Sequence, residues 1–289
     1  MLKKPKVEHK LRGGIDKPPN LVGVVIGSLL IVLFFGFPYA LMFITSLKTR
    51  LEVTDIPPVY FPEEPRWANY LDVWTSAVNP ASSLLATTVI AVGATLLVLL
   101  VATPAAYYIA RFRFPGRMIF LLLVLVTQML QPTVLAVGLF QEFKGWQGYA
   151  VWGALILING AFNLSFAIWI MQAFFASVPK EVDEAALIDG LGRLQTMFRI
   201  SLPLVWPGIV TAIVFVFVNS WNEFAAALIL VRQNDLQPLT VSMPRFLGLY
   251  VQDWQYLFTV ALVAIVPVII LFSFIEKRLI GGLTAGSVK

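Results

Sequence analysis

Residues 179–203 read PKEVDEAALIDGLGRLQTMFRISLP, a polar stretch that lies between long apolar segments of the chain. Pro179 suits the first turn of a helix, because its missing N–H leaves no hydrogen bond unmade there. Acidic residues crowd the turns that follow, where they favour the positive end of the helix dipole, and Gly190 is a natural helix stop. A second short helix is predicted over residues 193–200, before Pro203. The stretch therefore predicts a compact, charged knob of two short helices (residues 178–203), suited to docking a partner.

The composition places the rest of the chain in a membrane. Of the 289 residues, 58% are hydrophobic and only 13% are charged, and the mean hydropathy is +0.82. Soluble proteins carry about 25% charged residues. Six runs are long and apolar enough to cross a hydrocarbon layer about 30 Å thick, and in lipid such runs form helices. They are 21–47, 81–110, 118–141, 145–179, 200–222 (resuming after Glu223 to 231) and 257–275. The fourth run is longer than one span needs, so part of it is expected at an interface.

The basic residues predict the orientation of these spans, because Lys and Arg concentrate in cytoplasmic loops. Fifteen of the 21 basic residues fall on one side of a six-span arrangement and six on the other. The first side holds residues 1–20, the connection between the second and third runs, the knob and the C-terminus, which are therefore predicted to be cytoplasmic. A nucleic-acid surface is disfavoured, because the cations are scattered over short loops.

Seven residues of the knob, together with four segments elsewhere, carry a family resemblance. The seven are Glu184, Ala185, Ala186, Gly190, Ile200, Leu202 and Pro203; the segments are Ser46-Leu47-Lys48, 110–116 (ARFRFPG), Trp221-Asn222-Glu223-Phe224 and 282–289 (GLTAGSVK). The knob resembles the EAA loop of the membrane-spanning subunits of binding-protein-dependent ABC importers. The four segments are similar to the carbohydrate branch of that family, including its maltose-type inner-membrane permeases.

The resemblance implies an all-α integral membrane protein with six transmembrane helices and the ABC importer permease fold. Residues 1–20 would be a cytoplasmic tail, and residues 21–289 would form the transmembrane permease domain, with the EAA coupling loop at 178–203. The protein would lie in the cytoplasmic (inner) membrane of a bacterium or archaeon as a multi-pass protein with both termini inside.

The resemblance also implies a function: the permease subunit of an ATP-driven importer for a sugar or oligosaccharide, forming half of the translocation path. The implied partners are a second homologous permease, two ATPase subunits, an extracytoplasmic substrate-binding protein and membrane lipid, but no nucleic acid. The chain lacks a Gly-x-x-x-x-Gly-Lys-Ser/Thr loop, so ATP would be bound by the partner subunits, and the chain itself is expected to be no enzyme. Glu184 would meet a basic residue of the ATPase; the alternative is an ordinary solvated acid at a helix start.

No catalytic, cofactor or metal site is expected within the chain. It has no cysteine, and its one histidine, His9, lies in the N-terminal tail. Disulfides and thiolate metal sites are therefore excluded, and a Ser-His or His-metal site is not expected.

Polar residues within the spans are candidates for the transport path, because they are expensive in lipid. They are Gln128, Gln131, Asn159, Asn163, Asn219, Asn222 and Glu223. Amides can donate to and accept from sugar hydroxyls, but they serve equally well as hydrogen-bonding groups between helices. Asn219 and Asn222 are three residues apart and share a helix face. With Trp221 and Glu223 they form the predicted substrate path, although Trp221 suits an interface anchor equally well.

Two alternative functions remain open from the sequence. One is an ABC permease for a solute other than a sugar, such as a glycerol phosphate. The other is a self-sufficient secondary transporter, a class that typically shows internal repeats and buried ionisable groups. The spans hold almost no charge, which counts against that second class.

Overall fold

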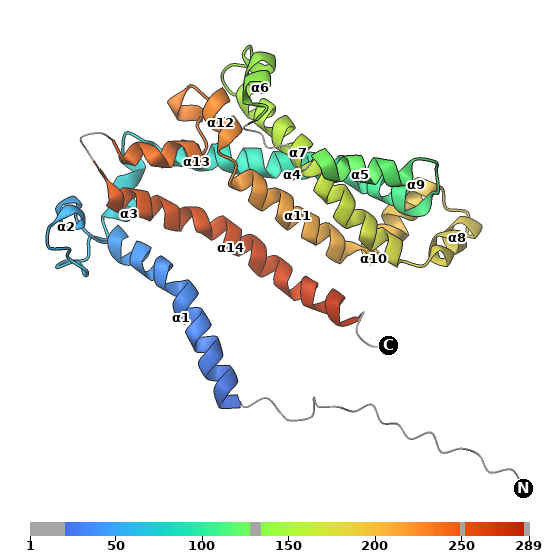
Figure 1. The fold of residues 1–289 in the computed structure, drawn as a ribbon, viewed down its shortest axis with the longest axis horizontal. Helices are drawn as coiled ribbons and strands as arrows, with labels where there is room; N and C mark the ends of the chain where they lie inside the picture. The colour runs from blue at the N-terminus through green and yellow to red at the C-terminus, as the bar shows by residue number, and fades with distance from the viewer. Residues whose placement is uncertain (1–20, 128–133, 249–251, 286–289) are drawn as a thin grey trace, which may run out of the picture.

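The chain folds into an elongated bundle of helices with shorter helices gathered around its ends (Figure 1). The structure is a computed structural model, and it describes the backbone of residues 21–127, 134–248 and 252–285. Within these ranges β-structure is limited to one isolated bridge between Leu247 and Gln252. The expectation of an all-α protein is confirmed for this part of the chain.

Five of the six predicted spans are helices that are long and apolar enough to cross a membrane. In chain order they are α1 (Leu21–Ser46), α4 (Pro80–Arg111), α7 (Ala150–Ser177), α11 (Trp206–Trp221) continued by α12 (Ala225–Leu230), and α14 (Trp254–Ala285). The fourth run is indeed longer than its helix, since residues 145–149 precede α7 as a loop and turn. In the fifth run, which the sequence predicts from residue 200, the long helix α11 begins only at Trp206.

The third predicted span, residues 118–141, is not described as one helix. Its two ends form α5 (Arg117–Thr127) and α6 (Ala136–Phe143), and residues 128–133 between them lie outside the described residues, as do residues 1–20 and 286–289. Gln128 and Gln131 therefore remain without a structural description. The count of six spans stays a prediction.

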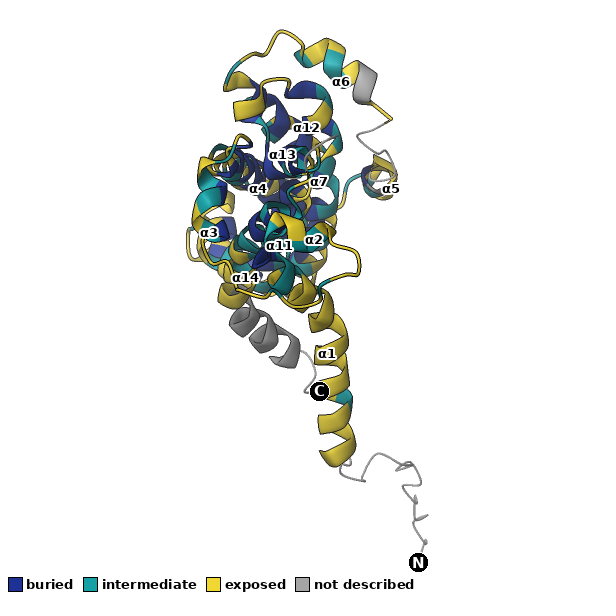
Figure 2. Cartoon of the chain, turned by 90° about the vertical axis from the view of Figure 1, so that its left-hand side faces the viewer, coloured by how far each residue is buried: buried dark blue, intermediate teal, exposed yellow. Residues whose placement is uncertain are grey.

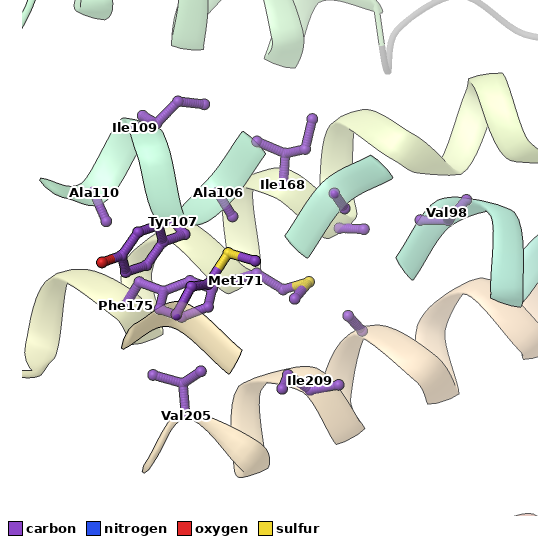
Figure 3. Packing of buried hydrophobic residues seen from close by; sticks show 14 of the residues in the cluster. Val98, Ala106, Tyr107, Ile109, Ala110, Ile168, Met171, Phe175, Val205 and Ile209 are labelled. Carbon is purple, nitrogen blue, oxygen red and sulfur yellow. The ribbon is translucent and has the colours of Figure 1, made fainter. Parts of the chain in front are cut away.

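The centre of the bundle is formed by α4, α7 and α11, and α4 packs most extensively against α7. Small residues bring these helices close together. A Cβ added to Gly160 would lie 2.7 Å from Leu97 Cδ2, and one added to Gly93 would lie 2.6 Å from Ile156 Cδ1. Figure 2 shows the buried residues concentrated in these helices, and Figure 3 shows the cluster in which Tyr107, Met171 and Ile209 of the three helices meet.

Helix α1 stands apart from this core. No residue of its most apolar 18-residue stretch is buried, and its buried residue is Ser46 at the very end. Figures 1 and 2 show α1 leaving the body of the molecule next to α2 and α14. An apolar helix that is exposed on all sides requires lipid or a partner helix around it.

Shorter helices occupy the two ends of the bundle and the loops between spans. They are α2 (Arg50–Thr54), α3 (Asn69–Asp72), η1 (Val73–Thr75), α8 (Lys180–Ile188), α9 (Arg193–Thr196), η2 (Met197–Ser201), α10 (Leu202–Leu204), η3 (Asn234–Leu236), α13 (Leu239–Ser242) and η4 (Met243–Phe246). The helices α8, α9, η2 and α10 form the knob, at the end of the bundle where α4 and α7 finish (Figure 1).

A glycine at the contact between α7 and α11 gives a direct test of this packing. A Cβ added to Gly208 would lie 2.7 Å from Phe174 Cβ, whereas one added to Gly36 of α1 would meet nothing within 4 Å. We expect Gly208→Ala to destabilise the protein by about 1–3 kcal/mol through overpacking. Gly36→Ala should stabilise it by roughly 0.5–1 kcal/mol, because alanine favours a helix interior. Thermal unfolding of both variants in detergent measures the difference; shifts of the same sign and size would contradict the packing.

Candidate coupling site and transport path

The first half of the knob is α8, and its end is fixed by backbone hydrogen bonds. Gly190 has φ of +86°, the left-handed conformation that favours glycine. Its N–H donates to the carbonyl of Leu187 over 3.1 Å, and the N–H of Leu191 donates to the carbonyl of Ala186, also over 3.1 Å. These two bonds form a Schellman motif, which satisfies carbonyl groups that the helix end leaves free. Gly190 therefore stops α8 as its sequence predicts.

The second half of the knob is helical from Arg193 to Ser201, with a π-helical turn over Met197–Ser201. Gly192 begins it, and the Gln195 side chain accepts a hydrogen bond of 3.1 Å from the Gly192 N–H. The Arg193 guanidinium lies 4.7 Å above the centre of the Phe112 ring. This cation–π contact joins the knob to the 110–116 turn at the end of α4.

Asp183 anchors the knob to the membrane body. Of the three acids at the start of α8 it is the buried one, while Glu181 and Glu184 are exposed. Its Oδ2 lies 2.7 Å from Arg111 Nε and accepts a hydrogen bond of 2.9 Å from the Tyr107 hydroxyl. Its Oδ1 accepts a hydrogen bond of 2.7 Å from the Ser201 hydroxyl. One carboxylate thereby joins α8 to the end of α4 and to the end of η2.

Arg111 extends the same network to α7. Its Nη1 donates a hydrogen bond of 2.7 Å to the carbonyl of Val178, the residue that follows α7. Its Nη2 lies 3.3 Å from Asp183 Oδ1, and both side chains are buried, at 6% and 10% exposure. A buried ion pair of this kind requires both partners, because either one alone would be an uncompensated charge.

The sequence reasoning missed this anchor. From the sequence, Asp183 is interpreted as one of the acids that favour the positive end of the helix dipole. Arg111 is interpreted only as a basic residue that indicates the orientation and as part of segment 110–116. One signal was present: Asp183 and Ala186 are three residues apart, so they share a helix face. The burial of Ala186 against the chain's own core identifies that face as the inner one.

The exposed side of the knob combines charged residues, Glu181 and Glu184 among them, with apolar side chains. Glu184 and Ala185 are exposed on α8. Beside them lie exposed apolar residues, with Ile188 at 86% and Leu194 at 69% exposure; the others are Leu187 and Phe198. We call Glu184, Ala185, Leu187, Ile188, Leu194 and Phe198 the docking face. Large apolar side chains gathered on an exposed face are typical of an interaction surface.

The remaining residues of the predicted coupling motif lie within or behind the knob. Ala186 is buried, so it does not offer a small surface to a partner as Ala185 does. Ile200 and Leu202 are half-buried, with Leu202 packed on the core cluster of Figure 3, and Pro203 is exposed. The motif thus combines one exposed pair with positions that shape and anchor the knob.

The predicted transport-path amides lie on the surface of α11. Asn219 and Asn222 are exposed, and each amide nitrogen donates to a carbonyl one turn earlier, of Phe215 over 2.9 Å and Val218 over 2.8 Å. Asn159 and Asn163 of α7 are buried and make the same kind of bond within their own helix.

Trp221 and Glu223 have structural partners within the chain. The Trp221 ring is buried and stacks on Phe217, with ring centres 5.3 Å apart. The Glu223 carboxylate accepts hydrogen bonds from the N–H groups of Ala226 (2.6 Å) and Ala227 (3.2 Å) and so caps the start of α12. In residues 21–127, 134–248 and 252–285 no three His, Asp or Glu side chains come together as metal ligands would.

A double-mutant cycle tests the anchor. Asp183→Ala leaves the buried Arg111 guanidinium unpaired, and we expect it to destabilise the protein by about 3–5 kcal/mol, with Arg111→Ala alone in the same range. The double variant Asp183→Ala/Arg111→Ala should be less destabilised than the sum of the two, because no charge then remains unpaired. Thermal unfolding of the four proteins in detergent gives the coupling; strict additivity would refute the pair's role.

Comparison with known proteins agrees with this geometry. Residues 99–283 match the family described as binding-protein-dependent transport system inner membrane component. The sulfoquinovosyl glycerol transport system permease of Agrobacterium fabrum is 33% identical over 254 residues, which are 88% of each chain. The trehalose/maltose transport system permease of Thermococcus litoralis is 28% identical and covers 92% of this chain and 96% of its own.

Solved structures share the fold. A chain of a bacterial ABC transporter that imports the acidic polysaccharide alginate superposes with a TM-score of 0.73 at 20% identity, covering 95% of this chain and 99% of its own. The family match spans well over half of the chain and includes the knob, α11 and most of α14. The chain therefore belongs to the family of inner-membrane permease components of binding-protein-dependent ABC transport systems, whose members are transporter subunits and not enzymes.

Proposed function

We propose that the chain is the permease subunit of an ATP-driven importer of a sugar or oligosaccharide, and that the docking face of the knob takes up the motion of a partner ATPase. The observation that carries the proposal is the knob itself. It presents Glu184 and large apolar side chains outward while a buried ion pair fixes it to α4 and to the end of α7. A surface built in this way can receive a push from a partner and pass it to the membrane helices.

The relatives support the substrate class. Their names state transport of sulfoquinovosyl glycerol, diacetylchitobiose and trehalose/maltose, which all contain a sugar. The match to this family also disfavours a self-sufficient secondary transporter. ATP would be bound and hydrolysed by two ATPase subunits, and the Glu184 carboxylate would pair with one of their basic residues.

The exposed helices support the further partners. Helix α1 has no buried residue in its apolar centre, as expected of a helix that meets lipid and a second, homologous permease subunit. Asn219 and Asn222 lie exposed on α11, as residues lining half of a shared path would. One similar solved transporter is a complex with a substrate-bound periplasmic protein, which supports an extracytoplasmic binding protein as the donor of substrate.

The proposed topology has six spans, with residues 118–141 as the third and both termini in the cytoplasm. The knob follows the cytoplasmic end of α7 in this arrangement. Residues 1–20 would form a cytoplasmic tail, and residues 21–289 one permease domain.

Coupling is tested by reversing the charge of the docking face. Glu184→Lys should reduce ATP-driven uptake by the assembled transporter about tenfold, because a loss of about 1.4 kcal/mol in docking free energy weakens binding of the ATPase by that factor. Glu64→Lys is the matched control, since Glu64 is an exposed acid between α2 and α3, away from the knob, and it should retain uptake. Uptake in proteoliposomes and co-purification of the ATPase are the measurements. Equal uptake by both variants would exclude Glu184 from coupling.

The orientation is tested with single cysteines in this cysteine-free chain. Glu64→Cys lies in the exposed segment between α2 and α3, and Gln195→Cys lies on the knob. A membrane-impermeant thiol reagent added to intact cells should label the first and not the second. Labelling only of the knob cysteine would reverse the proposed topology.

The path is tested by removing both amides of α11. Asn219→Leu/Asn222→Leu should slow uptake or change the preference among sugars, because two exposed hydrogen-bonding groups are lost from one helix face. Asn159→Leu is the comparison, since its amide is buried and bonded within α7. Uptake is measured across a sugar panel, with ATPase co-purification as the assembly control. Unchanged rates and selectivity would leave Asn219 and Asn222 outside the path.

A further inference from the structure

A pocket of about 530 Å³ lies at the other end of α7 from the knob. The end of α6 and the loop after it form one wall, and the end of α12 and the loop after it form the other. Its aromatic, charged and amide lining residues include Phe140, Lys144, Trp146, Gln147, Arg232 and Gln233. Its volume lies in the range of small-molecule sites.

The rim of the pocket carries two positive charges, and the acids nearest to it in sequence, Glu142 and Asp235, do not line it. Lys144 and Arg232 line it, and the lining residues include neither Asp nor Glu. The ion pairs of the described chain involve other residues, so neither cation is held by a carboxylate. The Arg232 guanidinium lies 4.9 Å from the centre of the Phe140 ring, and Lys144 Nζ donates over 3.0 Å to the amide oxygen of Gln141. Both cations are thus positioned by neutral partners.

The inner part of the pocket is aromatic and apolar, and its walls are fixed to each other. The indole N–H of Trp152 donates a hydrogen bond of 2.9 Å to the carbonyl of Leu236, which ties α7 to the loop after α12. Val151, Leu230, Val231 and Leu236 belong to one buried cluster. Trp146 is 41% exposed and meets Phe143 edge to face, with ring centres 5.3 Å apart. The pocket is therefore formed by packed elements and not by a loose loop.

We propose that this pocket is a receiving site for the anionic group of an acidic saccharide, a carboxylate or sulfonate held between Lys144 and Arg232. The inference rests on the proposed function and narrows its substrate class. Arg232 can bind such a group with two parallel N–H donors, and Lys144 supplies a second charge. The sugar ring packs on Trp146, and its hydroxyls find the amides of Gln147 and Gln233.

The position of the pocket fits delivery of substrate from outside. Val151 lies at the start of α7 and the knob follows its end, so the 28 residues of α7 separate the two by about 42 Å along the helix. With the knob in the cytoplasm, the pocket lies on the outer side. Two cations without an ion-pair partner favour an anionic sugar over a neutral one, because hydrogen bonds to an anion are stronger, and the amides and the Trp146 ring suit a hydroxylated ring.

The test uses the assembled transporter in nanodiscs of zwitterionic lipid, with Gly145→Cys as the one cysteine of this permease; Gly145 lies between Lys144 and Trp146, and an added Cβ there meets nothing within 4 Å. The rate of its modification by a neutral thiol reagent is followed with digalacturonate, an acidic disaccharide, and with a neutral galactose disaccharide. At a digalacturonate concentration four times the one that halves the modification rate, we expect the rate of cysteine modification to fall about fivefold. The neutral disaccharide should slow it much less.

A charge-matched pair of variants completes the test. Lys144→Gln/Arg232→Gln should remove the protection, whereas Arg66→Gln/Arg245→Gln, which removes two positive charges away from the pocket, should retain it. Equal protection by both disaccharides, or none by either, would overturn the proposal. Protection by phosphatidylglycerol in the nanodisc but not by digalacturonate would overturn it in favour of a lipid site. Uptake of a neutral-sugar panel in the same preparation reports separately on the proposed function, which fails if ATP drives uptake of no sugar.

Discussion

The buried pair of Asp183 and Arg111 is the contact on which the knob depends. Removing two charges from water is expensive, and the structure offsets this with hydrogen bonds to Tyr107, Ser201 and the carbonyl of Val178. Each of these groups belongs to a different part of the chain: α4, η2 and the end of α7. The network therefore ties the knob and the adjacent ends of α4 and α7 into one hydrogen-bonded unit.

The close packing of α4, α7 and α11 allows that unit to act over the length of the bundle. A Cβ added to Gly208 would meet Phe174 Cβ at 2.7 Å, and one added to Gly93 or Gly160 would displace the end of the Ile156 or Leu97 side chain. Helices packed in this way move together, because dense interiors shift between discrete arrangements and do not deform continuously. The same three helices carry the exposed amides of Asn219 and Asn222 on α11 and the pocket at the start of α7. The knob and this pocket are therefore connected through the packed central helices.

Five of the six predicted spans and the two-helix knob could be predicted from sequence, because they follow from length, hydropathy and helix-stop chemistry. Gly190 is an example, since only its left-handed φ lets the Schellman bonds form. The role of Asp183 could not be predicted in the same way, because Asp183 and Glu184 are both acids at a helix start. What distinguishes them is a contact with Arg111, 72 positions earlier. Trp221 could not be placed from sequence for the same reason. An aromatic residue next to two amides is compatible with the wall of a transport path, but in the structure Trp221 is buried and stacks on Phe217, one turn earlier.

The break between α11 and α12 shows how one acidic residue can shape an apolar span. Helix α11 ends at Trp221, and the first N–H groups of the next helix need a partner from outside that helix. The Glu223 carboxylate is that partner, because it accepts hydrogen bonds from the N–H groups of Ala226 and Ala227. The backbone carbonyl of Glu223 in turn accepts a hydrogen bond of 2.7 Å from the Thr240 hydroxyl. The break leaves Asn219 and Asn222 at the end of α11, on the surface that continues toward α12. The Glu223 carboxylate thus fixes the start of α12 directly after the two exposed amides, which explains an acidic residue within an apolar run without any contact to a substrate.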